Sequence, residues 1–142
     1  MKPVDQTIFG PRPNGKVGNC VSACIASLLD LDIADVPYFM GTDDEPDDLW
    51  KKRINRWLAP RGLSFMHFKT DGRWFSQWPP GYFILMGRSP RGLHAVVARG
   101  EKIVHDPHPS RDGLKSIDGF AVLLPLDPAK CRTRTRSSRR SR

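Results

Sequence analysis

The decisive stretch of this sequence is Gly18-Asn19-Cys20-Val21-Ser22-Ala23-Cys24-Ile25-Ala26-Ser27-Leu28-Leu29, in which a cysteine opens an apolar segment. Its apolar residues recur at the spacing of one helix face, and they are Val21, Cys24, Ile25, Leu28 and Leu29. Gly18 and Asn19 interrupt regular structure just before this segment and provide residues that can cap a helix. The pattern therefore predicts a helix from about Cys20 to Leu29.

The place of Cys20 in the first turn of this helix favours a reactive thiol. Unpaired backbone N–H groups and the positive end of the helix dipole stabilise an anion there, so we expect a lowered thiol pKa. A buried cysteine is also a common small packing residue, which is our interpretation of Cys24 on the apolar stripe. For Cys20 the helix start favours catalysis over packing.

The remaining sequence predicts helical elements first and strands afterwards. A turn of helix is expected near 33–36, and a second helix is expected from Pro46, Asp47 and Asp48 to Trp57 or Leu58. Strands are expected at 63–68, 82–87, 93–99, 102–105 and 120–126. This order predicts an α+β fold with an antiparallel sheet in one domain, residues 1–128.

Two of these strands form a predicted hairpin that carries chemistry. Gly100-Glu101 is the expected tight turn, so the start of one strand lies beside the end of the next. Counting back from the turn brings His94 near Asp106. A carboxylate beside an imidazole fixes its tautomer and stabilises its protonated form. If the sheet packs on the helix of Cys20, a Cys-His-Asp arrangement results, in which the acid orients the base and the base activates the sulfur.

These segments also carry a resemblance to a known family. G-N-C-V-S-A-C-I-A-S-L-L at 18–29, H-A-V-V at 94–97 and V-H-D-P at 104–107 resemble the papain-like cysteine peptidases in order and spacing. The similarity is greatest to the bacteriocin-processing, C39-like branch, and it spans roughly residues 6 to 107. The resemblance implies a papain-like fold, in which N-terminal helices with the nucleophile at a helix start pack on an antiparallel β-sheet.

The resemblance also implies roles for individual residues. Cys20 would be the nucleophile, His94 the general base and acid, and Asp106 the residue that orients His94. The implied reaction is hydrolysis of an amide bond, peptide or isopeptide, in a peptide or protein substrate through a thioester acyl-enzyme, without a cofactor. Acyl transfer to an amine would use the same residues.

The family has a glutamine before the nucleophile, whose side-chain amide joins the cysteine N–H in holding the oxyanion. It usually stands six positions before the cysteine, where this sequence has Asn14, a residue of shorter reach. Gln6 has the family's side chain but lies further back, across a loop rich in Pro and Gly. We favour Gln6 over Asn14, because loop length varies more easily than side-chain reach. A second departure is Val21, where the family has glycine.

Basic charge is concentrated at one end of the chain. The formal net charge is +8. Lys130 and the six arginines of 132–142 contribute seven of these positive charges, so the rest of the chain has a net charge of +1. Residues 129–142 have almost no apolar side chain, so we expect a disordered, solvated tail. The same composition would suit weak contact with nucleic acid or another polyanion. The alternative to an enzyme is thus a non-catalytic papain-like binding module, or an assembly component, whose tail contacts nucleic acid or an acidic partner.

Other features of the sequence limit the remaining function classes. An odd number of cysteines, with Cys131 in the tail, argues against a disulfide framework. His105 and His108 flank Asp106, but their spacing to the cysteines is not that of a zinc site, so no metal is expected. No apolar run is long enough to span a bilayer, and no secretory signal is visible at residues 1–6. We therefore expect a cytoplasmic protein without membrane contact.

Overall fold

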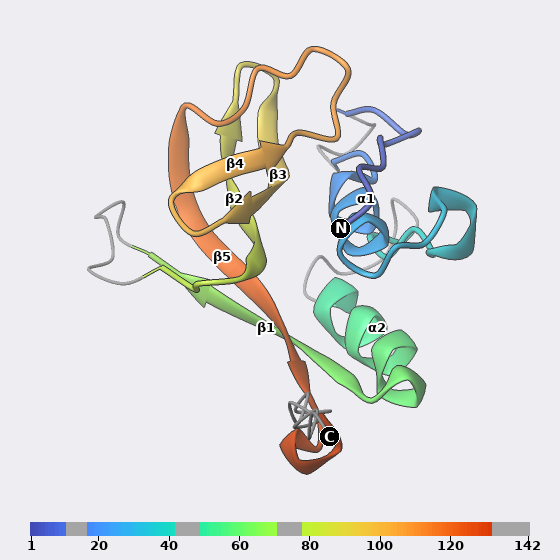
Figure 1. The fold of residues 1–142 in the computed structure, drawn as a ribbon. Helices are drawn as coiled ribbons and strands as arrows, with labels where there is room; N and C mark the ends of the chain where they lie inside the picture. The colour runs from blue at the N-terminus through green and yellow to red at the C-terminus, as the bar shows by residue number, and fades with distance from the viewer. Residues whose placement is uncertain (11–16, 42–48, 71–77, 132–142) are drawn as a thin grey trace, which may run out of the picture.

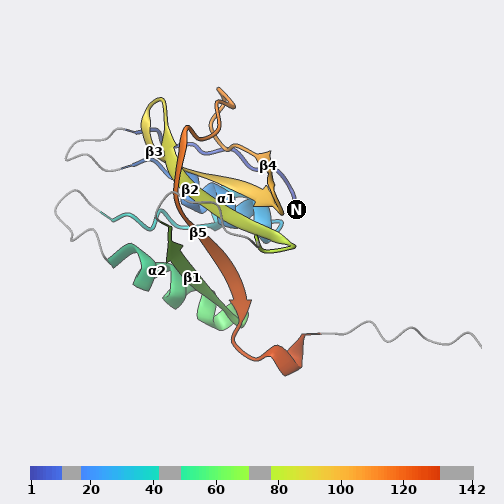
Figure 2. The ribbon, with the colours of Figure 1, turned by 90° about the vertical axis from the view of Figure 1, so that its left-hand side faces the viewer.

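The computed structural model of the 142-residue chain describes residues 1–10, 17–41, 49–70 and 78–131. In these ranges two α-helices accompany one antiparallel sheet of five strands, so the α+β class is confirmed. Both helices lie on the same side of the sheet (Figure 1), and in the view turned by 90° the strands β2, β3 and β4 cross in front of α1 (Figure 2).

The helices are α1 (Cys20–Leu28) and α2 (Leu49–Leu58), with single 3-10 turns at Ile33–Asp35, Ala59–Arg61 and Pro128–Lys130. The strands are β1 (Leu63–Lys69), β2 (Tyr82–Ser89), β3 (Gly92–Arg99), β4 (Lys102–His105) and β5 (Ser116–Pro125), and they lie in the order β1-β5-β2-β3-β4. The last strand therefore begins earlier than the sequence predicts, and it lies between β1 and β2. Its partners are set by long-range burial, which local periodicity does not encode.

Helix α1 is buried on every side, not only along its apolar stripe. All residues from Cys20 to Ser27 are buried, and the helix packs against β3 and β2. Small side chains on the remaining faces make this close packing feasible, and their hydroxyls are satisfied by hydrogen bonds. Ser22 Oγ donates to the carbonyl of Pro37 at 2.6 Å, and Ser27 Oγ accepts from Val4 N–H at 3.0 Å. The helix that carries Cys20 is thus the centre of the domain.

Helix α2 supports the other end of the sheet. Ile54 and Leu58 on its inner face are fully buried and belong to the same apolar core as α1. The Asn55 amide accepts from Phe65 N–H at 2.7 Å and donates to the Phe65 carbonyl at 3.2 Å, which joins the helix to β1. Residues 46–48, where the sequence predicts the start of this helix, lie outside the described residues.

The β3–β4 hairpin contains a β-bulge shortly before Asp106. Ala98 pairs with Ile103, but Val97 pairs with His105, so Val104 is an extra residue in β4. A bulge of this kind bends the strand locally. Asp106 follows directly after β4, and its Oδ1 lies 2.7 Å from His94 Nε2.

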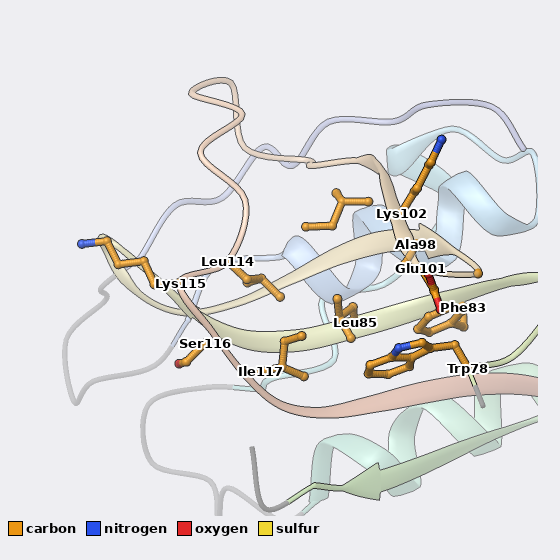
Figure 3. A pocket seen from close by; sticks show the side chains of 12 residues that line it. Trp78, Phe83, Leu85, Ala98, Glu101, Lys102, Leu114, Lys115, Ser116 and Ile117 are labelled. Atoms are coloured by element: carbon orange, nitrogen blue, oxygen red, sulfur yellow. The ribbon is translucent and has the colours of Figure 1, made fainter. Parts of the chain in front are cut away.

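The sheet face opposite the helices has a small apolar cluster of its own. Phe83, Leu85, Val96 and Ala98 are buried there. The Trp78 ring stacks on Phe83, with ring centroids 5.8 Å apart. Trp78 and Phe83 line a cavity of about 410 Å³ on this face, from which the ammonium groups of Lys102 and Lys115 point away (Figure 3).

The described chain continues past β5 through a short 3-10 turn to Cys131. Residues 132–142, which contain most of the predicted basic tail, lie outside the described residues. None of the helices in the described ranges combines the length and the apolar character that crossing a membrane requires.

The central position of α1 predicts a large stability cost for truncating its buried face. Ile25→Ala should lower the free energy of unfolding by roughly 2–5 kcal/mol, because it leaves a cavity where a fully buried side chain was packed. Leu126→Ala is the matched control, since Leu126 is 57% exposed, and it should change the free energy by less than about 0.5 kcal/mol. Urea unfolding followed by circular dichroism measures both values, and equal effects would contradict the assigned core.

Candidate active site

Cys20 lies at the junction of the central helix and β3. It is the first residue of α1 and is only 3% exposed. The backbone N–H of Ala95, the residue after His94 on β3, is close enough to its sulfur to favour the thiolate. Packing of α1 against β3 thus brings the cysteine next to the strand that carries the histidine, although the two are far apart in the sequence.

His94 and Asp106 form a short, buried pair. His94 Nε2 lies 2.7 Å from Asp106 Oδ1, and both side chains are almost completely buried. The carboxylate is held in turn by backbone donors. His108 N–H donates to Oδ1 at 2.9 Å, and Gly113 N–H donates to Oδ2 at 2.7 Å. The acid is therefore fixed in position, and it fixes the plane of the imidazole.

This pair also determines which ring nitrogen is available for chemistry. Because Asp106 engages Nε2 of His94, it favours the tautomer with the proton on that nitrogen. Nδ1 then carries the free lone pair. A general base needs such a nitrogen within reach of the proton it removes. Cys20 and His94 line the same cavity, so Nδ1 is the ring nitrogen that could serve as a base there.

The expected lowering of the Cys20 pKa is wrong for the resting site. Burial raises the pKa of the Cys20 thiol to about 11, and the hydrogen bonds from the N–H groups of Ala95, Val21 and Cys20 itself only partly oppose this effect. The helix start stabilises the thiolate as predicted, but loss of hydration outweighs it. The thiol is therefore neutral at rest, and forming the thiolate at neutral pH would require a neighbouring base.

Asp106 shows the opposite balance of forces. Burial tends to raise the pKa of its carboxyl, but the hydrogen bonds from His94 and from the N–H groups of His108 and Gly113 together bring the pKa below its usual value of 3.8. The carboxylate is accordingly ionised at neutral pH. It provides a permanent negative charge beside His94, which stabilises an imidazolium when one forms.

Gln6 is held next to Cys20 by the residues that precede the helix. Asn19 Oδ1 accepts hydrogen bonds from the N–H groups of Thr7 at 2.9 Å and Ile8 at 2.8 Å. Gly18 passes so close to this segment that an added Cβ would lie 2.0 Å from the Ile8 carbonyl oxygen. The sequence predicts that Asn19 caps the helix, but the Asn19 side chain makes no cap hydrogen bond. No local sequence pattern predicts that Asn19 holds the segment of Gln6 in place.

The loop after Asp106 holds the same segment from its other side. Gln6 N–H donates to the Pro107 carbonyl at 3.0 Å, and Arg111 pairs with Asp5 through both of its terminal nitrogens. His105 Nε2 lies 2.9 Å from the Val4 carbonyl oxygen. The N-terminal segment is thus anchored both to the start of α1 and to the strand and loop that carry Asp106.

Gln6, Cys20 and His94 line one cavity of about 270 Å³. The side-chain amide of Gln6 donates one hydrogen bond from Nε2 to the Ile8 carbonyl at 3.0 Å. Its second N–H is a donor that remains for a ligand. Asn14, the other predicted oxyanion donor, lies outside the described residues. The cavity therefore brings together a thiol, an imidazole backed by a carboxylate, and an amide donor.

Other residues that the sequence singled out lie elsewhere. Cys24, within α1, is fully buried in the apolar core, as a packing residue would be. Trp78 lines the larger cavity on the opposite face of the sheet, whose lining contains no cysteine or histidine. The size of that cavity is no guide to chemistry, and the smaller cavity at Cys20 is the candidate site. Over the described ranges no three His, Cys, Asp or Glu side chains are grouped as metal ligands.

Comparisons of the chain with protein-family models, with curated proteins and with solved structures found no match in any of the three.

The lowered pKa of Asp106 predicts a pH-dependent contribution to stability. In the native protein Asp106 stays ionised below 3.8, where the unfolded chain becomes protonated, so its contribution is present above that pH and is lost as pH falls through the native pKa. The difference in unfolding free energy between the wild type and Asp106→Asn should therefore be largest near neutral pH and shrink in acid. Urea titrations over this range measure it, and a constant difference would contradict the assigned hydrogen bonds.

Proposed function

We propose that this protein is a papain-like cysteine hydrolase that cleaves an amide bond in a peptide or protein. One observation carries the proposal, namely the cavity in which Cys20 and His94 meet the amide of Gln6, with Asp106 behind the histidine. Each component has a chemical task in acyl transfer, and a packing function alone does not require them to converge. The α+β fold with the cysteine at a helix start supports the same assignment.

The first step forms the acyl-enzyme. His94 Nδ1 takes the proton of the Cys20 thiol while the sulfur attacks the substrate carbonyl carbon, and a C–S bond forms as the carbonyl becomes an oxyanion. The oxyanion accepts hydrogen bonds from the Gln6 amide and from the backbone N–H of Cys20. The first N–H groups of a helix have no partner within the helix, and the Cys20 N–H, which faces the sulfur in the resting site, would take this role.

Collapse of this intermediate breaks the C–N bond. The leaving amine takes the proton from His94, and a thioester remains on Cys20. His94 then removes a proton from water, which attacks the thioester, and the carboxylic acid product leaves as the proton returns to the sulfur. An amine in place of water would give transfer instead of hydrolysis. Asp106 keeps the imidazole in place through both halves of the reaction and stabilises its protonated form.

The raised thiol pKa makes the role of His94 testable by chemistry that needs no substrate. With a pKa of about 11, the Cys20 thiol holds almost no thiolate at neutral pH, so it would react only if a base takes its proton as the sulfur attacks. With His94 as proton acceptor, iodoacetamide should alkylate Cys20 at a lower pH than it alkylates the exposed Cys131. In His94→Ala this advantage should disappear. Peptide mass spectrometry across pH measures both sites in the same sample.

If Cys20 reacts no faster than Cys131 in the wild type, the hydrolase proposal fails. The alternative, a non-catalytic papain-like binding module or assembly component with a basic tail, would then be preferred.

Acyl transfer itself can be tested with p-nitrophenyl acetate, an activated ester that needs little specific recognition. The sulfur of Cys20 should displace p-nitrophenolate and carry the acetyl group until water removes it. We expect Cys20→Ala to abolish the acetyl adduct in intact-protein mass spectrometry, and His94→Ala to slow nitrophenolate release by roughly a hundredfold to ten-thousandfold. Cys131→Ala is the matched cysteine control and should retain the rate. An adduct that persists in Cys20→Ala would exclude Cys20 as the nucleophile.

A further inference from the structure

Two buried polar atoms without a hydrogen-bond partner occur among the described side chains, and both belong to residues of the Cys20 cavity. They are Oε1 of Gln6 and Nη2 of Arg91. Buried polar groups in folded proteins are nearly always satisfied, so each exception needs an explanation. Both residues line one cavity, so a ligand bound there is one source of the missing partners.

Arg91 is placed at the cavity by the turn between β2 and β3. That turn is only Pro90 and Arg91, and Ser89 Oγ accepts from Arg91 N–H at 3.2 Å. The guanidinium is oriented by Asp112, whose Oδ2 lies 2.9 Å from Nη1. Because Asp112 holds one terminal nitrogen of the fork, the other, Nη2, is presented in a fixed direction.

Positive residues line the cavity directly. Its lining includes Arg88 and Arg91 and contains no aspartate or glutamate. Asp112 pairs with Arg91, and Asp106 with His94, from behind. The field of Arg91 is felt within the site, since burial and then the positive charge of Arg91 lower the pKa of His108, another lining residue. A cavity lined with cations favours an anionic ligand, and a guanidinium with a free terminal N–H suits a carboxylate.

We propose that Arg91 binds a carboxylate of the substrate close to the bond that Cys20 attacks. This inference rests on the proposed function, and it adds a substrate class, namely peptides that carry a negative charge beside the scissile amide. The carboxylate is either that of an acidic side chain or that of a peptide C-terminus. In either case it would accept a hydrogen bond from Nη2 while Asp112 holds Nη1 of Arg91.

Iodoacetate and iodoacetamide test this inference on the full chain. The two reagents are almost equal in size, and both lose iodide as the sulfur of Cys20 forms a C–S bond, but only iodoacetate carries a carboxylate. The ratio of their alkylation rates at Cys20 therefore reports recognition of the negative charge, while the state of the thiol cancels. We expect Arg91→Gln to lower the ratio about tenfold, as loss of a hydrogen bond between charged groups would.

Arg56→Gln is the matched control, because it removes the same charge from an exposed position on α2. It should leave the ratio unchanged. Added NaCl should also lower the wild-type ratio by screening, and this measurement does not depend on any variant folding. A ratio that is insensitive to both Arg91→Gln and salt would overturn the inference. If iodoacetamide instead alkylates Cys20 equally well in the wild type and in His94→Ala, the proposed function itself would be overturned.

Three peptides distinguish the two sources of the carboxylate by their protection of Cys20 from iodoacetamide. The peptides are acetyl-Ala-Glu-Ala-amide, acetyl-Ala-Gln-Ala-amide and acetyl-Ala-Ala-Ala with a free C-terminus. Better protection by the glutamate peptide than by the glutamine peptide would assign an acidic side chain, and better protection by the free acid would assign a C-terminus. Either preference should be lost in Arg91→Gln. Equal protection by all three peptides would contradict carboxylate recognition.

Discussion

The packing of α1 against β3 is the constraint on which the rest of this structure depends. It buries the helix on every side, and it brings the sulfur of Cys20 to the backbone N–H of Ala95, beside the histidine. A fully buried helix with small side chains has little freedom to shift, because protein interiors are close-packed. The position of Cys20 relative to His94 is thus set by the core itself and not by a mobile loop.

The N-terminal segment depends on the same packing. It is held by Asn19 at the start of the helix and by Pro107 and Arg111 in the loop that follows Asp106. Gln6 therefore has its place only when helix, hairpin and loop are all assembled. For the proposed hydrolase, a site built in this way would be preorganised, since its donors are already oriented before a substrate binds and little reorganisation is needed during reaction.

The site also buries ionisable groups and unpartnered polar atoms. Burial makes the Cys20 thiolate unfavourable, and a carboxylate is buried beside a histidine instead of being exposed. Gln6 and Arg91 each keep a buried polar atom without a partner. Sequences that fold well satisfy such groups, and the exceptions in natural proteins concentrate at functional sites. These buried polar groups destabilise the folded state, and the apolar core formed by the two helices and the sheet offsets that loss of stability.

The sequence alone predicted the α+β class, the helix that begins at Cys20 and the hairpin of β3 and β4, because each has a local pattern: helical spacing of apolar residues, or strands around a glycine turn. It also placed His94 near Asp106 by counting along that hairpin. Only the tertiary structure decided that β5 lies between β1 and β2, that the N–H groups of His108 and Gly113 fix Asp106 against His94, and that Asn19 and Arg111 hold the segment of Gln6. The thiol pKa was mispredicted for the same reason. Local patterns describe what a segment prefers, whereas strand order, register shifts and desolvation arise from contacts between segments far apart in the chain.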